Sequence, residues 1–280
     1  MPFYAIVKSD SRDLEKSIRT KTETYIVKIL LAGGSGGVGS ATIPYLRTHH
    51  EVRVLDLTAP AHDVEFVQGS IAEPDALDKA LGGVDSFITM VMQGGQDGLD
   101  REHSVEQAIG NYQTNCLGLH LLLLKAFELG IKAGVHTSTM SAHNRNRRYY
   151  PSEEEVPLDG PNVYGLSKGF SEQICRYFAR EYDMSLAALR ISGPRNREQF
   201  IAQYNDPPRR PWGQQLYLTD EEDLANAYLS ALEFVHKSHG RFDAFFIAGD
   251  AAHEEMNMSK ARSLLGWEPL AAKKLGLESE

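Results

Sequence analysis

YIVKILLAGGSGGVGSATIPYLR, residues 25–47, is the stretch that decides the fold. It opens with an apolar run at 26–31 that is rich in β-branched residues, as expected of a strand buried on both faces. A helical pattern with apolar residues at 38, 43, 45 and 46 closes it. Between them lie five glycines within seven positions: Gly33, Gly34, Gly36, Gly37 and Gly39. Strand, glycine turn and helix form the first half of a βαβ unit, in which such a turn binds a dinucleotide.

The glycine turn suits a diphosphate for physical reasons. Glycine permits the tight turn and lets backbone N–H groups approach the phosphates, and the helix N-terminus adds unpaired donors and partial positive charge. Gly33, Gly36 and Gly39 fit G-x-x-G-x-x-G, and a frame starting at Gly34 fits G-x-G-x-x-G. A glycine cluster alone also fits a plain flexible turn. The expected cofactor contacts are Gly33, Gly36, Gly37, Val38 and Gly39.

The next predicted strand, 51–57, carries Asp56 about 20 residues beyond the glycines. A carboxylate there accepts both hydroxyls of the adenosine ribose and repels a 2′-phosphate, which favours NAD over NADP. Alone, Asp56 would be interpreted as a strand-end turn residue. Together with the glycines it predicts an NAD site.

Composition narrows the class of protein. The chain has 280 residues and a net charge of −9, which argues against a nucleic-acid partner. No apolar run approaches membrane-spanning length, and the N-terminus lacks a signal-peptide pattern. Two cysteines in predicted helices and scattered histidines indicate neither a disulfide framework nor a metal site. We expect a soluble, cytoplasmic protein with no metal.

The order of predicted elements indicates three parts. Residues 1–24 form an N-terminal extension, and 25–194 alternate strands with helices, which predicts an α/β fold with a doubly wound parallel sheet, the Rossmann fold. Residues 195–280 are expected to form a small substrate-binding region interleaved with the main domain. Within it, 195–215 is predicted to be loop, and TDEE at 219–222 to be a capping box that begins a helix.

A long helix is predicted over 102–129. One face recurs at three- and four-residue spacing and is expected to be buried. Its members are Val105, Ile109, Tyr112, Cys116, Leu119 and Leu123. Asn115 lies in the same run, where an Asn facing water would be the default interpretation.

Tyr164 and Lys168 open another predicted helix with Y-x-x-x-K spacing. Residues at i and i+4 share one helical face. A free tyrosine has a pKa of about 10, too high for a base at neutral pH, and a nearby ammonium stabilises the phenolate. Lys168 is also able to hydrogen-bond a nicotinamide ribose. Such a pair is common by chance, but its position after the fifth strand of a glycine-turn sheet favours catalysis.

These motifs together resemble the extended short-chain dehydrogenase/reductase superfamily, the NAD-dependent epimerase/dehydratase group. The matching pieces also include Asn115 before Gly118, Arg190 before Gly193-Pro194, and LLGWEP at 264–269. The resemblance implies that Tyr164 is the catalytic base, that Thr139 orients the substrate, and that Asn115 supports the active-site helix and a proton relay. Ser138 and Ser141 are alternatives to Thr139. Ser70, Ile71 and Thr89 are the further cofactor contacts that it implies.

Within the superfamily the resemblance is closest to uronate dehydrogenases, through GGVGS at 36–40, YYP at 149–151, EVP at 155–157 and YGLSK at 164–168. Those enzymes oxidise the anomeric carbon of a free hexuronic acid with NAD. Met140-Ser141 stands where family dehydratases carry an Asp-Glu pair, which argues against dehydration. Arginines in the expected substrate loops are candidates to bind a carboxylate: Arg195, Arg197, Arg209 and Arg210.

We therefore expect an NAD-dependent oxidoreductase acting by Tyr-assisted hydride transfer on a small sugar, sugar acid or polyol. Two alternatives stay open: a nucleotide-sugar 4-epimerase that retains its NAD, and a non-catalytic NAD-binding regulator. A homodimer through the helices at 102–129 and 163–182 matches the habit of the family.

Overall fold

The computed structural model describes residues 27–93, 103–144, 146–209, 216–237 and 239–277. The extension expected at 1–24 lies outside the described residues. In the described part, no helix combines the length and apolar character needed to cross a membrane.

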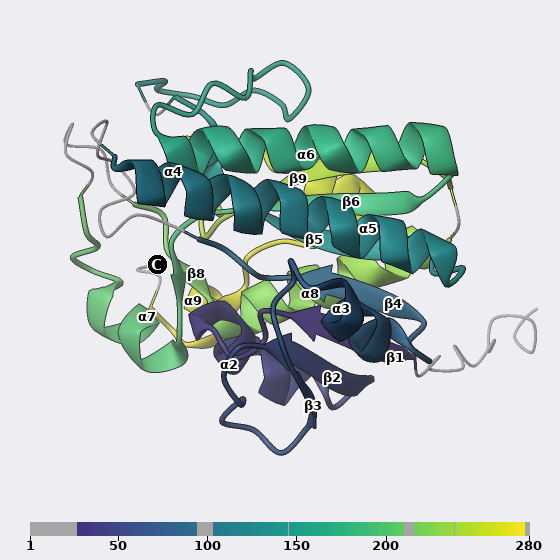
Figure 1. Ribbon diagram of the computed structural model, residues 1–280. Helices are drawn as coiled ribbons and strands as arrows, with labels where there is room; N and C mark the ends of the chain where they lie inside the picture. The colour runs from purple at the N-terminus through teal and green to yellow at the C-terminus, as the bar shows by residue number, and fades with distance from the viewer. Residues whose placement is uncertain (1–26, 94–102, 145, 210–215, 238, 278–280) are drawn as a thin grey trace, which may run out of the picture.

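A seven-stranded parallel sheet forms the centre of the molecule (Figure 1). The doubly wound α/β architecture predicted from the alternation of elements is confirmed. Each strand pairs in parallel with its neighbours, and β9, from the C-terminal part of the chain, extends the sheet beyond β6. In spatial order the strands are β3 (Glu65–Gln68), β2 (Glu51–Asp56), β1 (Lys28–Ala32), β4 (Ser86–Thr89), β5 (Ala133–Thr139), β6 (Ser185–Ile191) and β9 (Phe242–Ile247).

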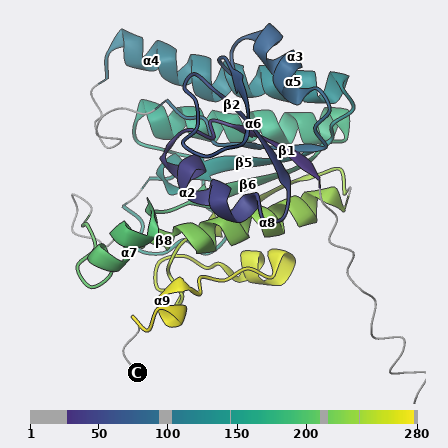
Figure 2. The ribbon, with the colours of Figure 1, turned by 90° about the horizontal axis from the view of Figure 1, so that it is seen from below.

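Helices cover both faces of this sheet (Figure 2). One face carries α2 (Gly37–Leu46) and α8 (Glu221–His236), with η3 (Ala261–Leu265) packed on α8. The other face carries α3 (Pro74–Leu81), α5 (Leu119–Glu128) and α6 (Val163–Tyr182), and α4 (Val105–Asn111) leads into α5 through the π-helical segment η1 (Tyr112–Gly118). Because both faces are covered, strands such as β1 are apolar along nearly their whole length.

Two apolar clusters fill the spaces between the sheet and the two helix layers. Alternate residues of β1 divide between them: Leu31 packs on the α2–α8 side, and Leu30 packs on the α3–α5–α6 side. The period-two alternation of a strand produces this division.

The segment after β6 differs from the prediction of loop. It forms β7 (Pro194–Arg195) and α7 (Arg197–Gln203), and β7 pairs with β8 (Thr219–Asp220). The capping-box prediction was wrong about the capping residue, because Asp220 is the N-cap of α8 and accepts from the Glu222 N–H. The Thr219 hydroxyl instead donates to the Ser192 carbonyl.

The buried face predicted for the helix at 102–129 was wrong in its first half. Val105 is 70% exposed and Ile109 58% exposed, whereas Leu119 and Leu123 are buried. The helix is also interrupted by η1, whose wider turns rotate the residues after it relative to those before. The remaining short helix is α9 (Ala271–Lys274), and η2 (Met140–Ala142) is a single 3-10 turn after β5.

Candidate active site

The glycine turn joins β1 to α2 at the carboxyl edge of the sheet. Gly33 has a φ of +88°, and a Cβ there would lie 2.5 Å from the Val91 backbone nitrogen. A Cβ on Gly39 would lie 2.3 Å from the Gly34 carbonyl oxygen. These two glycines are therefore required by the fold itself.

The other side of the turn is open. A Cβ on Gly36 would meet only the Gly33 carbonyl oxygen, at 3.4 Å, and one on Gly37 would meet nothing within 4 Å. Gly36 is also the N-cap of α2, so the unpaired N–H groups of that helix face the same opening. An opening of this form, bordered by helix N–H donors, fits a dinucleotide diphosphate.

A cavity of about 400 Å³ lies against this open side, and we call it the glycine-turn cavity. The predicted contacts Gly33, Gly36, Gly37, Val38 and Gly39 all line it. Its opposite wall comes from β7, α7 and α8, which sequence reasoning did not connect with the turn. The residues of that wall are Pro194, Arg195, Asn196, Gln199, Glu221 and Leu224.

Asp56 lies at the end of β2, across from the turn. Its Oδ2 accepts from the Ser35 N–H at 3.0 Å, and its Oδ1 accepts from the Leu57 N–H at 2.7 Å. The carboxylate is half-buried, so it holds the glycine turn in place and remains accessible. That position is compatible with binding ribose hydroxyls.

Ser70 and Ile71 follow β3. The Ser70 hydroxyl accepts from the Ala72 N–H, and the Ile71 side chain is buried against Gly118 of η1. The Ile71 side chain therefore has a packing role.

Tyr164 lies in the first turn of α6, and Asn162 caps this helix by accepting from the Gly165 N–H. The Tyr164 hydroxyl donates to the Met92 sulfur at 3.7 Å. Met92 also lines the glycine-turn cavity. This contact connects the predicted catalytic tyrosine with the predicted cofactor site.

Lys168 lies one helical turn further along and is 2% exposed. Its Nζ donates to the Thr137 carbonyl at 2.6 Å and lies 3.2 Å from His136 Nε2. Burial lowers the pKa of Lys168 to about 8, although nearby acidic groups, including Glu172, oppose the shift. Thr89, at the end of β4, contacts the other nitrogen of His136 at 2.7 Å.

The structure separates the three candidate hydroxyls at the end of β5. Ser138 donates to Glu172 Oε1 at 2.6 Å and is buried beneath α6. Thr139 accepts from the Ser141 N–H at 3.1 Å where the strand ends. Ser138 is thus committed to a buried carboxylate, and Thr139 and Ser141 remain the candidates.

Glu172 and Arg190 form a buried ion pair behind these residues. Arg190 Nε and Nη2 donate to the two Glu172 oxygens at 2.9 and 2.7 Å, and both side chains are at most 1% exposed. Burial would raise the pKa of Glu172, but the charge and hydrogen bonds of Arg190 lower it overall. The pair fastens α6 to β6 below the site.

Asn115 lies in η1 and does not face water, contrary to the default interpretation. Its amide nitrogen donates to Ser167 Oγ at 2.9 Å and to the Gln93 carbonyl at 3.0 Å, and its Oδ1 accepts from the Gln93 N–H. These bonds tie the segment after β4 to α6 next to Lys168. A π-helical segment is a frequent feature of functional sites.

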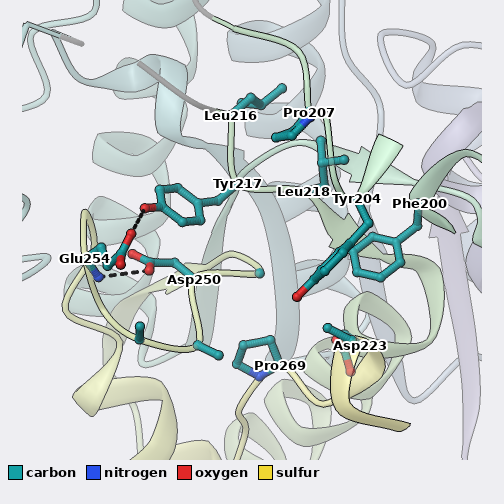
Figure 3. A pocket seen from close by; sticks show the side chains of 14 residues that line it. Phe200, Tyr204, Pro207, Leu216, Tyr217, Leu218, Asp223, Asp250, Glu254 and Pro269 are labelled. Carbon is teal, nitrogen blue, oxygen red and sulfur yellow. Dashed lines mark hydrogen bonds between the residues drawn. The ribbon is translucent and has the colours of Figure 1, made fainter. Parts of the chain in front are cut away.

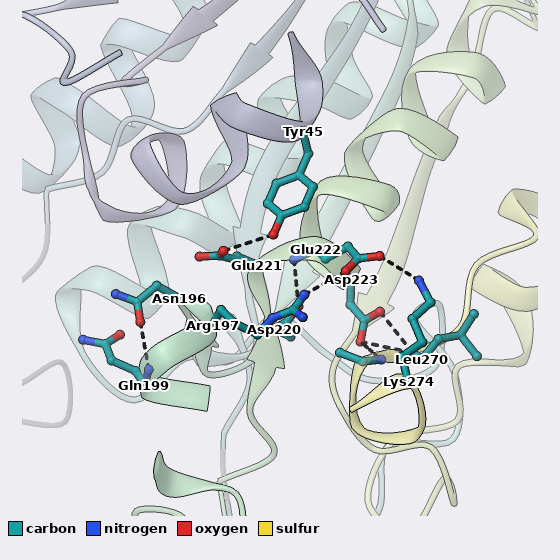
Figure 4. A network of polar contacts seen from close by, with 11 residues as sticks. Tyr45, Asn196, Arg197, Gln199, Asp220, Glu221, Glu222, Asp223, Leu270 and Lys274 are labelled. Carbon is teal, nitrogen blue, oxygen red and sulfur yellow. Dashed lines mark hydrogen bonds and ion pairs between the residues drawn. The ribbon is translucent and has the colours of Figure 1, made fainter. Parts of the chain in front are cut away.

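Of the four arginines, only Arg195 lines the glycine-turn cavity among the residues that the structure describes. Arg197 instead forms ion pairs with Asp220 and Glu222, both at 2.8 Å (Figure 4). Arg209 is exposed, and Arg210 lies outside the described residues. The carboxylate-binding prediction for Arg197 therefore gives way to a structural role.

The polar network of Figure 4 also includes a residue of α2, the helix that follows the glycine turn. Tyr45, on α2, donates to Glu221 Oε1 at 3.1 Å, and Glu221 lines the cavity. Burial and the charge of Glu221 raise the pKa of Tyr45 to about 12. The tyrosine therefore stays a neutral donor that fixes the carboxylate.

A second cavity, of about 330 Å³, lies between α7, the segment before β8 and the segment after β9 (Figure 3). We call it the C-terminal cavity. Aromatic side chains and carboxylates surround it, and its described lining includes no lysine or arginine. The lining residues that matter below are Phe200, Tyr204, Tyr217, Asp223, Asp250 and Glu254.

Sequence reasoning missed His136 and Glu221 as members of the site. His136 had a visible signal, because AGVHTST places polar residues at 136 and 138 on one face of a strand that should be buried on both sides. Glu221 had none, because only the long-range contact with Tyr45 brings it to the cavity.

Comparison with known proteins identifies the family to which the chain belongs. The model of the NAD dependent epimerase/dehydratase family matches residues 29–242. UDP-glucose 4-epimerase of Halalkalibacterium halodurans is 32% identical over 168 residues, covering 58% of this chain and 49% of that protein. Uronate dehydrogenase of Pseudomonas putida is 27% identical over 180 residues, covering 61% of this chain and 62% of that protein. The matched stretch thus spans 49% and 62% of the length of these two relatives.

Solved structures show the same fold. A mutated uronate dehydrogenase superposes with a TM-score of 0.70 at 22% identity, covering 90% of this chain and 84% of that one. A short-chain dehydrogenase/reductase superfamily protein from Agrobacterium tumefaciens with bound NAD gives 0.66 at 21% identity, covering 86% and 92%. Since the family model matches most of the chain, the protein belongs to the NAD dependent epimerase/dehydratase family.

Proposed function

We propose that the protein is an NAD-dependent dehydrogenase that oxidises a small free sugar or sugar acid, with Tyr164 as the base. The observation that carries the proposal is the contact between the Tyr164 hydroxyl and Met92, a residue that also lines the glycine-turn cavity. A base there lies beside the space in which the cofactor would be held. Bound NAD supplies the hydride acceptor.

The chain's own residues would divide the work as follows. The α2 N-terminus and the open side of Gly36 and Gly37 hold the diphosphate, and Asp56 accepts the ribose hydroxyls. Tyr164 removes the proton of the substrate hydroxyl, and Thr139 or Ser141 orients its oxygen. Lys168 supplies positive charge next to Tyr164 and a donor for the ribose.

The substrate class is inferred from the polar wall of the glycine-turn cavity. Arg195 lines it together with Asn196 and Gln199. Arg195 Nε donates to Gln203 and one of its Nη atoms to the Pro194 carbonyl, which leaves further N–H groups for a ligand. A guanidinium and two amides in one cavity wall suit a carboxylate and hydroxyls, as a hexuronic acid carries them.

The negative charge of the C-terminal cavity disfavours the alternative of a nucleotide-sugar epimerase, whose substrate carries a diphosphate. The described lining of the C-terminal cavity has Asp223, Asp250 and Glu254 and no cationic side chain. Asp250 already accepts three backbone N–H groups and Glu254 accepts from Tyr217, so these carboxylates stay in place. A diphosphate would be repelled there.

We also propose that the protein is a homodimer and that it works in the cytoplasm. Exposed apolar side chains form a dimer patch on α4, η1 and α6, which lie side by side (Figure 1). Within it, the ring of Tyr112 in η1 lies beside that of Phe170 in α6, with the ring centroids 6.3 Å apart. The patch consists of Val105, Ile109, Tyr112, Leu166 and Phe170. The free thiols of Cys116 and Cys175 suit a reducing compartment.

The test is a screen for NADH formation with free uronic acids, aldoses and polyols, run beside an assay for interconversion of UDP-sugars. Net NADH with a free sugar acid supports the proposal. Interconversion of UDP-sugars without net NADH would replace it with the epimerase. Tight NAD binding without turnover of any compound would favour a non-catalytic regulator.

A further inference from the structure

A buried line of polar groups runs from the end of β4 to α6. Thr89 Oγ1 lies 2.7 Å from His136 Nδ1, and His136 Nε2 lies 3.2 Å from Lys168 Nζ. All three side chains are at most 4% exposed. Such a line inside a sheet is costly unless every member is satisfied, so its bonding pattern is strongly constrained.

The donors and acceptors fix the arrangement of protons. A lysine ammonium only donates, so His136 Nε2 accepts from Lys168 and the ring proton lies on Nδ1. That Nδ1–H donates to Thr89 Oγ1. The ring is neutral in this arrangement, because burial and the charge of Lys168 lower the pKa of His136 well below its ordinary value.

Two of the N–H donors of Lys168 are already used within the protein. Of its three N–H bonds, one goes to the Thr137 carbonyl and one to His136. One N–H remains. We propose that His136 is a positioning residue for Lys168, which keeps the ammonium in its charged form and directs its last N–H toward the cofactor ribose and Tyr164. This inference rests on the proposed function for the role of that last N–H.

Other groups around Lys168 do not replace His136. Glu172 and Cys175 face it from α6 and Cys116 from η1. Glu172 is engaged by the guanidinium of Arg190, from β6. In the described part of the chain none of these groups hydrogen-bonds Lys168 Nζ, so His136 is the side chain that accepts from it.

The first test needs neither cofactor nor substrate. Lys168 has a pKa of about 8 in the fold and about 10.4 unfolded, so between these values the unfolded chain binds more protons and stability rises with pH. The difference in unfolding free energy between the native protein and Lys168→Met, measured across pH, isolates this contribution. It should begin to rise near pH 8.

The same difference is then measured in the backgrounds His136→Leu and His136→Gln. Leucine removes the acceptor, so the rise should begin about one to two pH units lower, as expected for one lost hydrogen bond to a charged group. Glutamine keeps an oxygen near the place of Nε2, so the native onset should return. An unchanged onset with leucine would overturn the inference. Should the leucine background fail to fold, Thr89→Val replaces it, with a smaller shift in the same direction expected.

The second test is turnover. In His136→Leu, kcat should fall about tenfold, and the alkaline limb of its pH profile should move to lower pH. The KM for the substrate should stay unchanged. In His136→Gln, kcat and its pH profile should return to those of the native protein. Loss of kcat without movement of the limb would mean a merely structural role and would contradict the inference. If none of the compounds tested as substrates lets the native protein reduce NAD, the proposed function fails. The unfolding series still decides the role of His136 in that case.

Discussion

Arg195 is the residue on which the proposed substrate class depends. Its partly engaged guanidinium lines the glycine-turn cavity beside two amides. Replacing it with glutamine should raise the KM for a uronic acid about 10- to 100-fold, the value of a hydrogen bond to a charged group. The KM for the matching neutral aldose should hold. Steady-state kinetics with both sugars checks this, with the exposed Arg209→Gln as control, and an equal effect on both sugars would contradict a carboxylate contact.

Glu172 is expected to matter for stability. Glu172→Gln leaves Arg190 as a buried charge without its carboxylate, which should cost about 3–5 kcal/mol of unfolding free energy. Because the pKa of Glu172 is lowered in the fold, the native pair stabilises at neutral pH and loses this effect as pH falls through that pKa. Urea unfolding should therefore show the gap between native and variant narrowing in acid.

The surface pair of Lys125 and Glu128 provides the control for this experiment. Glu128→Gln should change stability by less than about 1 kcal/mol at any pH. A cost for Glu172→Gln as small as that of the surface control would show that the buried pair contributes little.

At the scale of elements, different glycines of the turn between β1 and α2 are expected to serve folding and cofactor binding. A Cβ on Gly39 meets the backbone of Gly34 at 2.3 Å, so Gly39→Ala should destabilise the protein by roughly 1–3 kcal/mol or more. A Cβ on Gly36 meets only one oxygen at 3.4 Å and projects into the cavity, so Gly36→Ala should fold almost normally. Its NAD affinity should fall about tenfold or more, a loss of about 1.4 kcal/mol.

Thermal unfolding and NAD titration of the two variants provide the comparison. Normal NAD affinity in a stable Gly36→Ala protein would argue against the diphosphate lying on this turn.

The elements predicted from sequence were those whose pattern is local. α6 begins and ends where predicted, because its helical period is written in neighbouring residues. α7 was missed because its stabilising contact is distant: Arg197 reaches Asp220 and Glu222, more than twenty residues later. The predicted face at Val105 and Ile109 is apolar but exposed, because an apolar period cannot say whether the chain itself covers a face.

The site divides in the same way. The glycines, Asp56, Tyr164 and Lys168 follow from spacing, since each lies at a strand end or on the first turns of a helix. Glu221 depends on a contact between elements, so no spacing predicts it, whereas the polar residues at 136 and 138 of a buried strand were a signal for His136. The bond between Ser138 and Glu172, which narrows the candidates for the substrate-orienting hydroxyl to Thr139 and Ser141, joins two elements and has no signal in the sequence.

At the scale of the whole molecule, the doubly wound sheet exposes the dimer patch on its α4–α6 side. Phe170→Glu places a charge in the middle of this patch and should convert a dimer into a monomer, because a buried unpaired charge is strongly unfavourable at an interface. Sedimentation velocity checks the mass, and Tyr149→Glu, an exposed aromatic outside the patch, is the control. A native protein that sediments as a monomer would contradict the proposed assembly.

The sheet brings Tyr164 from α6 and the glycine turn from β1–α2 to one edge, and the account depends on these two parts acting on one cofactor. The most direct measurement is the rate of NADH formation by Tyr164→Phe relative to native protein, with NAD saturating and its binding measured separately. The account predicts a rate lower by about 10²- to 10⁴-fold, as for loss of a general base, with unchanged NAD affinity and a normal rate for Tyr177→Phe on the same helix. Equal rates for Tyr164→Phe and native protein would contradict it.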